Sequence, residues 1–358
     1  MDVELYRIKE DGVKHVSVGK LQKYLDADVF DFIRENVDRE GRLAVIDSES
    51  VLNVDFLDEG LDGIINVHKI NDINRVNKYF GAVNCKLIKG GIIVGCVETY
   101  WLRKKRILAK HHPIISYPIY FFDFILKRVF PKLKITQGLY FFITRGHNRA
   151  ISRAEAYGRL YSCGFKILEE RDINNLTYFA FKKVSEPKYD TEPTYGPFIK
   201  LRRIGKDGKH FNVRKFRTMY AFSEYLQEWI YEQNDLAAGG KFKDDPRITG
   251  YGRIMRKLWL DEFPMFWNVF KRQMKLVGVR PLSEQYFELY DKDVQERRIK
   301  YKPGLVPPYY VDLPHSLREI QDSEMRYLDA YDKHPIKTQW VYFWKAMWNI
   351  CVKRARSS

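Results

Sequence analysis

The stretch DPRITGYGRIMRKLWLDEFPMFWNV, residues 245–269, decides the fold of the second half of this 358-residue chain. From Pro246 to Ser283 there are eight basic residues and only two acidic ones, the adjacent carboxylates Asp261 and Glu262. Neighbouring like charges raise one another's pKa, whereas surrounding cations lower it. Proline is tolerated in the first turn of a helix, so Pro264 predicts a helix N-terminus at this dyad, where the helix dipole favours carboxylates.

The acidic dyad has two interpretations from the residues alone. An ionised aspartate can act as a nucleophile or as a Mg²⁺ ligand. Aspartate is equally a common N-cap residue, with no role beyond stabilising the first helical turn. The local sequence leaves both interpretations open, and the motifs around it have to decide.

Composition narrows the class of protein. The chain has 62 Lys and Arg against 46 Asp and Glu, a formal charge of +16, which predicts an anionic partner such as a nucleic acid, a phosphorylated small molecule or a membrane surface. No window approaches the ~20 apolar residues of a spanning helix. The N-terminus, MDVELYRIKEDG, lacks the apolar core of a signal peptide. The four cysteines form no CxxC pair, which argues against a zinc site. We therefore expect a cytosolic, two-domain chain.

The first half alternates between apolar runs typical of buried strands and helix-periodic segments. We expect strands at 43–46, 63–67, 92–97, 165–168 and 176–181, and helices within 70–87 and 150–162. The stretch NDINRVNKYFGAVNCKLIKGGIIVGCVET, residues 71–99, resembles the later part of a class I methyltransferase-type Rossmann fold. That family has a glycine-rich cofactor loop after its first strand. Here Ile46 is followed by Asp-Ser-Glu-Ser, so we expect an α/β Rossmann-like domain that lacks its cofactor loop and is non-catalytic.

A polar segment with two prolines, residues 185–195, predicts a linker. The expected organisation is therefore an unassigned segment at 1–40, the Rossmann-like domain at 41–184, the linker, and a second domain at 196–358. In the second domain we expect strands at 198–203 and 211–216, joined by a hairpin turn at 206–209, and a helix at 220–232.

Several motifs occur in a fixed order in the second domain: KFRTM at 215–219, the stretch quoted first, LVGVRPL at 276–282 and KPG at 302–304. This ordered set resembles the bacterial sugar transferases, the monotopic polyprenyl-phosphate glycosyl-1-phosphate transferases. The resemblance implies a mainly helical α+β catalytic domain. It also implies transfer of a sugar-1-phosphate from a nucleotide-diphosphate sugar to polyprenyl phosphate, which initiates surface polysaccharide or glycan assembly.

The same resemblance implies roles for individual residues. Asp261 would be the nucleophile that forms a covalent sugar-phosphate intermediate, Glu262 its helper, and both would hold Mg²⁺. Arginine can clamp a phosphate with two parallel hydrogen bonds. The phosphate-binding cations would be Arg280 and Arg256, supported by Lys215, Arg217 and Arg247, and Gly278 and Pro281 would form a nucleotide-binding turn.

The chain differs from the family in the segment that would contact the membrane. Family members carry a hydrophobic re-entrant helix just before the segment that matches 196–200, and here that place holds the polar linker. Two other segments could meet a membrane. Trp340, Trp344 and Trp348 fall on one helical face, and Pro113–Lys134 is rich in aromatic residues between basic flanks. The alternative for each segment is a core or inter-domain helix.

We therefore expect an enzyme on the cytoplasmic face of the bacterial inner membrane. A catalytically degenerate homologue that recruits or regulates a true transferase is the alternative. Nucleic-acid binding has no motif to support it, and we expect none.

Overall fold

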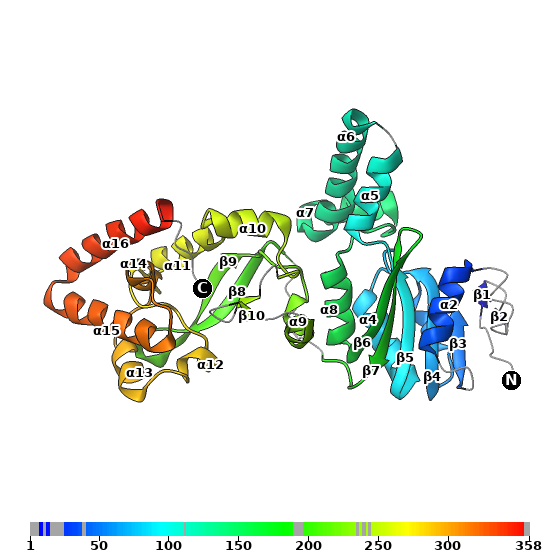
Figure 1. Cartoon of the computed structure of the whole chain (residues 1–358), viewed down its shortest axis with the longest axis horizontal. Coiled ribbons are helices and arrows are strands. Elements are labelled where there is room, and N and C mark those ends of the chain that lie inside the picture. Colours follow the sequence, from blue (N-terminus) through cyan, green and yellow to red (C-terminus); the bar gives the residue numbers. More distant parts are fainter. Residues whose placement is uncertain are drawn as a thin grey trace. The chain divides into compact units, whose positions relative to one another are not determined.

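The computed structural model describes residues 7–9, 12–14, 25–37, 41–110, 112–188, 196–233, 236–237, 241–242 and 245–353 (Figure 1). The chain separates into two compact units. Unit 1 is Met1–Tyr195 with Tyr220–Trp229, and unit 2 is Gly196–Met219 with Ile230–Ser358. Most of the linker expected at 185–195 lies outside the described residues.

Unit 1 is built around a five-stranded sheet of order β3-β4-β5-β7-β6. Strands β3 (Leu43–Ile46), β4 (Leu61–Lys69) and β5 (Leu87–Val97) are parallel, β7 (Leu176–Lys183) is antiparallel to β5, and β6 (Phe165–Ile173) forms a hairpin with β7. Asn174 and Asn175 join this hairpin with positive φ angles of 47° and 66°. Two successive positive φ angles suit the right-handed twist of a hairpin, and asparagine tolerates them. The expected strands are thus present.

Helices cover both faces of this sheet (Figure 1). Helix α2 (Ala27–Asn36) packs on one face, where Phe32 contacts Tyr178. Helices α4 (Val76–Lys86) and α8 (Arg153–Ser162) lie on the other face, where Tyr157 packs against Phe179. Tyr178 and Phe179 are successive residues of β7, so the period of two along the strand places them on opposite faces. The Rossmann-like class expected for this unit stays a prediction.

Three boundaries in unit 1 differ from the sequence expectation. Helix α4 is shorter than the periodic stretch 70–87, because Ile70 and Ile73 are buried in the turn that follows β4. Strand β5 begins at Leu87 and runs through Gly90, which has a φ of +90° that other residues rarely adopt. The segment 220–229 joins unit 1 instead of unit 2, since the ring of Phe222 packs under the guanidinium of Arg159.

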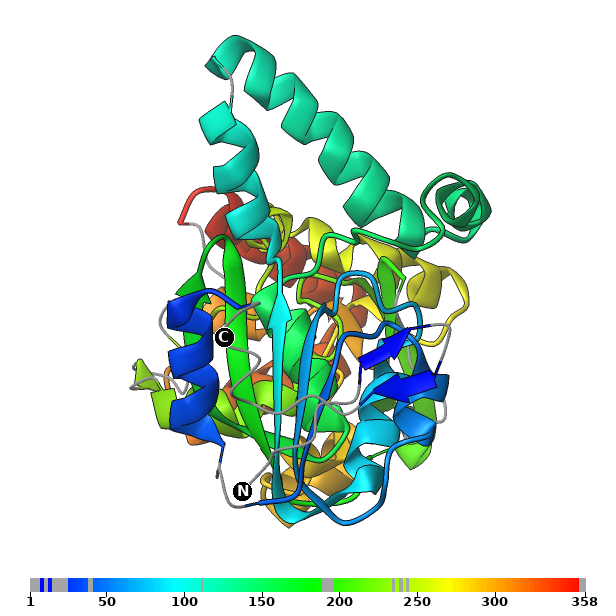
Figure 2. The same cartoon turned by 90° about the vertical axis from the view of Figure 1, so that its right-hand side faces the viewer.

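A helical arm interrupts unit 1 between β5 and α8. It comprises α5 (Tyr100–Lys110), α6 (Pro113–Phe124), a π-helical turn (Ile125–Val129), a 3₁₀ turn (Phe130–Lys132) and α7 (Lys134–Thr144). Figure 2 shows α5 and α6 as the two limbs of a hairpin that extends away from the sheet. Among the residues that the structure describes, no helix combines the length and apolar composition needed to cross a membrane.

Unit 2 combines short strand pairs with helices, as expected. The hairpin of β8 (Phe198–Ile204) and β9 (His210–Phe216) precedes α10 (Gly250–Lys257), the 3₁₀ helix η5 (Leu260–Met265) and α11 (Phe266–Phe270). Strand β12 (Lys275–Val277) pairs in parallel with β13 (Gly304–Val306). The remaining helices are α12 (Glu284–Phe287), α13 (Lys292–Arg298), α14 (Tyr309–Asp312), α15 (Leu317–Lys333) and α16 (Pro335–Cys351).

The core of unit 2 draws on both strand pairs, η5 and the helices α14, α15 and α16. Val213 of β9, Met265 of η5, Val277 of β12, Leu305 of β13 and Tyr327 of α15 share one buried cluster. This cluster fixes η5, and therefore the acidic dyad, against the β8–β9 hairpin. The minor elements are β1 (Arg7–Lys9), β2 (Gly12–Lys14), α3 (Val51–Asp55), the 3₁₀ turns Lys206–Gly208 and Ser223–Leu226, α9 (Gln227–Gln233), β10 (Leu236–Ala237) and β11 (Lys241–Phe242).

Candidate active site

The centre of the candidate site is an ion pair between β9 and η5. Lys215 Nζ donates to Glu262 Oε1 at 2.6 Å, across 47 positions of sequence. Glu262 is buried, and burying an unpaired carboxylate is unfavourable, so Lys215 is the group that permits its burial. Two of the predicted site residues are thereby brought into direct contact.

Asp261 lies next to Glu262 on the same 3₁₀ helix and is half-buried. Burial raises the pKa of Asp261 above its ordinary value, and the neighbouring Glu262 raises it further, while Lys215 and Arg256 oppose both. The N-cap of η5 is Trp259, with a φ of 60° and no side-chain cap bond. The interpretation of Asp261 as a mere N-cap is therefore wrong. The dyad lies in the first turn of a helix, as expected, and this helix is of the 3₁₀ type.

Arg256, near the end of α10, lies five residues before Asp261 in the sequence. Its Nε donates to Thr218 Oγ1 at 2.9 Å, which ties α10 to the end of the KFRTM motif. Burial lowers the pKa of the Arg256 guanidinium, and the charge of Asp261 counteracts that shift. Arg256 therefore contributes positive potential at Asp261, and its predicted contact with a phosphate stays a prediction.

A small cavity of about 70 Å³ lies beside the ion pair. Its lining includes four of the predicted site residues: Lys215, Glu262, Arg280 and Pro281. The others are Leu201, Arg203, Val213, Met265, Leu305, Pro307 and Tyr310. The volume suits a phosphate group better than a whole nucleotide, and two guanidinium groups at one small cavity are a typical arrangement for an anion.

Arg203 is the cavity residue that sequence reasoning missed. Burial lowers the pKa of its guanidinium, and the charge of Arg280 lowers it further, so the two arginines are electrostatically coupled. A signal was available, because Arg203 is two residues after Leu201 on β8 and therefore shares its inward face. Arg203 is not part of any of the quoted motifs, so the comparison of motifs did not select it.

The turn that carries Arg280 is held by backbone contacts. Gly278 lies against the partner strand, where a Cβ would come within 2.9 Å of the Gly304 backbone nitrogen. The Arg280 amide donates to Glu324 Oε1 at 3.2 Å, and Arg298 Nη2 donates to the Arg280 carbonyl at 2.6 Å. Gly278 thus has a packing reason for being glycine, and its predicted nucleotide contact stays a prediction.

The other predicted cations do not line the cavity. Arg247 makes a double hydrogen bond with Asp245, through Nε at 3.0 Å from Oδ1 and Nη2 at 2.7 Å from Oδ2, and both residues are buried. Arg217 Nε donates to the Gly196 carbonyl at 3.0 Å. These contacts give Arg247 and Arg217 structural roles, through a neighbour two residues away for Arg247 and through a segment 21 residues away for Arg217.

The donor set bears on the expected Mg²⁺. Within the described ranges, no group of three or more histidine, cysteine, aspartate or glutamate side chains is arranged to hold a metal ion. Mg²⁺ commonly takes one or two protein carboxylates and completes its shell with substrate phosphates and water. Asp261 and Glu262 supply that number of carboxylates, with Glu262 Oε1 already accepting from Lys215, and Mg²⁺ at the dyad stays a prediction.

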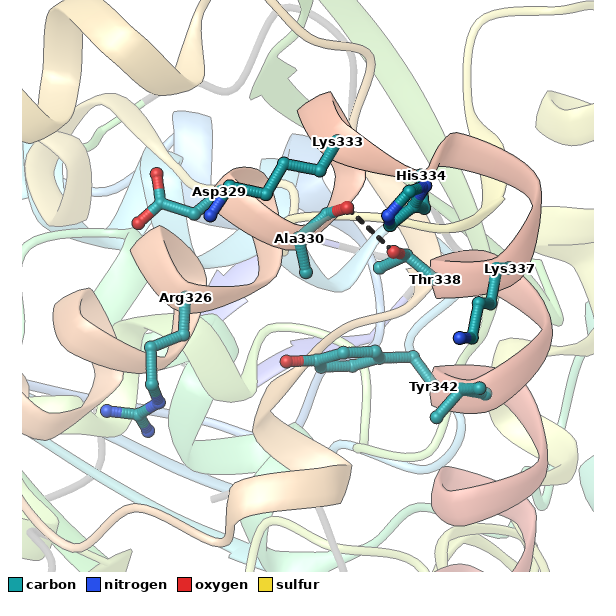
Figure 3. Close-up of a pocket in the computed structure, with 9 residues that line it drawn as sticks. Arg326, Asp329, Ala330, Lys333, His334, Lys337, Thr338 and Tyr342 are labelled. Atoms are coloured by element: carbon teal, nitrogen blue, oxygen red, sulfur yellow. Dashed lines mark hydrogen bonds between the residues drawn. The ribbon is translucent and has the colours of Figure 1, made fainter.

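A larger cavity, about 480 Å³, lies between α15 and α16 (Figure 3). Its rim includes Arg326, Lys333 and Lys337, and Thr338 Oγ1 donates to the Ala330 carbonyl at 2.8 Å on one side. None of the predicted site residues lines it. A choice between these two cavities by volume alone would therefore not have selected the one beside the dyad.

The elements around the dyad expose many apolar side chains. Those on α10, η5 and α11 are Tyr251, Ile254, Leu258, Leu260, Phe263, Phe266, Trp267 and Phe270. On α16, Trp340, Trp344 and Trp348 are exposed, whereas Tyr342, Ala346 and Ile350 pack into the core of unit 2. The interpretation of the tryptophan stripe as a face buried in the unit 2 core is therefore wrong.

Comparison with known proteins identifies the class. Residues 190–351 match the family described as bacterial sugar transferase. A galactosyl transferase of Streptococcus agalactiae serotype III is 33% identical over 141 residues, which is 38% of this chain and 31% of that protein. An undecaprenyl-phosphate galactose phosphotransferase of Salmonella typhimurium is 36% identical over 131 residues, 34% of this chain and 27% of that protein. The matched part thus spans under one third of each relative.

This C-terminal segment belongs to the bacterial sugar transferase family. The family match leaves residues 1–189 outside it. An O-methyltransferase family protein from Burkholderia thailandensis is similar at 14% identity over 44% of this chain and 40% of that one, with a TM-score of 0.24, too low to assign a fold.

Proposed function

We propose that this protein is a glycosyl-1-phosphate transferase that moves a sugar-1-phosphate from a nucleotide-diphosphate sugar to polyprenyl phosphate, on the cytoplasmic face of the bacterial inner membrane. The product would initiate a surface polysaccharide or glycan. One observation carries the proposal. The Lys215–Glu262 pair and Arg280 line one phosphate-sized cavity inside the segment that matches the family, and Asp261 directly precedes Glu262 on η5.

The reaction has two halves. In the first, a carboxylate oxygen of Asp261 forms a bond to the β-phosphorus of the donor. The bond from that phosphorus to the bridging oxygen breaks, and the nucleoside monophosphate leaves with the electron pair. In the second half, a phosphate oxygen of polyprenyl phosphate attacks the same phosphorus, and the Asp261 carboxylate leaves. The product is a polyprenyl diphosphate sugar.

The positive charges at the cavity can neutralise the negative charge of a phosphoryl group. Such reactions depend mainly on positioning and on neutralising charge on the phosphoryl oxygens. Arg280 and Arg203 line the cavity, and Arg256 adds potential at Asp261. Lys215 keeps Glu262 in place beside the nucleophile. Mg²⁺ held by Asp261 and Glu262 would neutralise further charge on the donor diphosphate.

The membrane surface is proposed to lie against the exposed aromatic groups of unit 2. Trp340, Trp344 and Trp348 form a stripe along α16, and Lys345 and Lys353 are on or just after the same helix. Aromatic rings with basic neighbours suit the headgroup region. Exposed apolar residues on α10 and η5 flank Asp261, so a lipid-linked acceptor would reach the nucleophile from the bilayer.

The test uses the full-length chain with nucleotide-diphosphate sugars and detergent-solubilised polyprenyl phosphate. We expect wild type to release nucleoside monophosphate and Asp261→Asn to release none. Asp293→Asn, an exposed aspartate in the first turn of α13, is the matched control and should behave as wild type. With donor alone, intact-protein mass should rise by one sugar phosphate, on the peptide that contains Asp261. Equal release by wild type and Asp261→Asn would refute the proposal.

A further inference from the structure

We propose that the helical arm of unit 1, residues 100–144, is a membrane-docking element whose α6 and α7 enter one leaflet of an anionic bilayer. The inference rests on the proposed function only in its choice of lipid as the occupant. It assigns a role to unit 1, which the transferase chemistry does not use.

The arm exposes an unusual amount of apolar surface. Single exposed hydrophobic side chains are ordinary in a soluble protein, whereas contiguous patches of this extent mark interaction sites. Ile135 is 96% exposed, Phe142 86% and Phe122 69%. The other exposed large apolar residues of α6 and α7 are Ile114, Ile115, Tyr117, Ile119, Phe121, Leu139 and Ile143, with Leu133 between them.

The distribution of exposed side chains around α6 favours lipid over a protein groove as the surface that this helix contacts. From Pro113 to Phe122, only Ser116 is buried and only Tyr120 is intermediate, while all other residues are exposed. Successive helical residues point about 100° apart, so the exposed side chains cover all of the helix except the face of Ser116, Tyr120 and Asp123 and are not confined to a narrow stripe. A single protein groove contacts one face of a helix, whereas lipid tails can surround it.

The arm is nevertheless held in a defined structure by ion pairs at its base. Arg103 of α5 is buried and donates to both Asp123 oxygens of α6, at 2.7 and 2.6 Å, and to Glu98 Oε2 at 2.9 Å. Arg128 donates to Glu155 Oε2 at 2.5 Å and so ties the π-helical turn to α8. The charges at the base are paired within unit 1, and the apolar side chains project beyond them.

Charge complementarity argues for an anionic surface. Helix α5 has five basic residues and no acidic one, and the only acidic residue from Pro113 to Thr144 is Asp123, which Arg103 engages. Lys104 Nζ lies 5.5 Å from the ring centroids of both Trp101 and Tyr120. Aromatic rings combined with lysine are typical of the membrane interface.

Helix length decides how deep the arm reaches. Helix α6 has 12 residues and is therefore about 18 Å long, against a hydrocarbon core of about 30 Å. The arm can accordingly enter one leaflet without crossing the bilayer.

The first test measures flotation of the full-length chain with vesicles of phosphatidylcholine containing phosphatidylglycerol. Phe122→Glu/Phe142→Glu places two charges on the exposed face, where neither side chain supports the fold. We expect at least about tenfold weaker partition than wild type, because burying each phenylalanine contributes strongly to partition. Leu52→Glu/Phe56→Glu is the matched control, at two similarly exposed positions of unit 1 away from the arm, and should bind as wild type.

The second test reports insertion directly, because exposed aromatic groups of unit 2 can also retain the protein on lipid. In a Cys85→Ser/Cys351→Ser background, which removes the two exposed cysteines, an environment-sensitive fluorophore is attached to Phe142→Cys or to Phe56→Cys. We expect a blue shift with vesicles at position 142 and none at position 56. A label at 142 that stays water-exposed while the protein floats overturns the inference. So does a dimer of the wild-type chain that Phe122→Glu/Phe142→Glu dissociates, which would make this face a self-contact.

Failure of the inference is separable from failure of the proposed function. With detergent-solubilised acceptor, the arm variant should release nucleoside monophosphate at the wild-type rate, and with vesicle-borne acceptor its rate should fall. If Asp261→Asn is as active as wild type, the catalytic proposal fails while the vesicle measurements keep their meaning.

Discussion

Removing the cation of the Lys215–Glu262 pair is the sharpest perturbation that this structure offers. Lys215→Met keeps the length and apolar stem of the side chain and removes its charge. Glu262 Oε1 then loses the donor at 2.6 Å, and the Glu262 carboxylate is left buried in the unit 2 core. We expect unit 2 to be destabilised for this reason and Asp261 to become harder to ionise.

The magnitude follows from the burial of both partners. Breaking a fully buried ion pair by removing one partner costs roughly 3–5 kcal/mol. The Lys215 side chain is 23% exposed and that of Glu262 10%, so solvent screens part of the interaction and we expect about 2–3 kcal/mol.

Guanidinium unfolding followed by tryptophan fluorescence measures this effect. Five of the seven tryptophans, residues 259, 267, 340, 344 and 348, belong to unit 2, so the signal reports mainly on that unit. The double variant Lys215→Met/Glu262→Gln is the matched control, because it removes both charges and should recover most of the loss. A single variant as stable as wild type, or a double variant no more stable than the single, would refute the reasoning.

The same variant has a consequence for the pH dependence of the proposed reaction. Burial already raises the pKa of Asp261, and Lys215 is the first cation that opposes this shift. Without Lys215 the pKa rises further. Since only the ionised carboxylate is nucleophilic, the acid limb of the rate profile should move to higher pH in Lys215→Met. An unshifted limb would mean that Asp261 is not the titrating nucleophile.

Three further predictions concern the same unit. Asp261→Asn should not destabilise the protein at pH 7, and could stabilise it slightly. A carboxyl whose folded pKa is raised contributes stability only below that pKa and loses it as pH rises, and the unfolding midpoint of the variant tests this. Gly278→Ala should cost about 1–3 kcal/mol, since its Cβ would lie 2.9 Å from the Gly304 nitrogen and force the β12 and β13 segments apart; denaturant titration measures it, and Gly250→Ala, with open space around it, is the control. Asn268→Ala should cost about 1–3 kcal/mol, because the buried side chain donates to the Asn212 carbonyl at 2.8 Å and accepts from the Arg214 amide at 3.1 Å; a thermal midpoint equal to wild type would contradict this.

Part of the fold could be read from periodicity and turn chemistry. The strands of unit 1 fall where apolar runs predict them, and Asn174 and Asn175, whose type is common in turns, join the last two of these strands. The extent of α4 could not be read in this way. Ile70 and Ile73 continue the helical spacing, yet both are buried in the turn after β4, and a pattern of apolar residues does not distinguish these two kinds of burial.

The solvent exposure of the aromatic side chains was a second property that the sequence left open. The tryptophans of α16 and the aromatic residues of α6 have the spacing of core-facing residues as much as that of membrane-facing ones. Only the packing of Tyr342 and Ala346 into the unit 2 core shows that Trp340, Trp344 and Trp348 point the other way. Packing choices of this kind depend on elements far away in the chain.

The sequence by itself determined the order of the motifs, the family of the C-terminal segment and the acidic dyad among basic residues. These properties depend only on which residues occur and on how far apart they lie along the chain. The tertiary structure decided which cations serve the dyad. Lys215 and Arg280 reach the cavity together with Arg203, whereas Arg247 is held by Asp245 and Arg217 by the Gly196 carbonyl. A long side chain's partner depends on which backbone passes nearby, and only folding places the β8–β9 hairpin, η5 and the Arg280 turn around one small space.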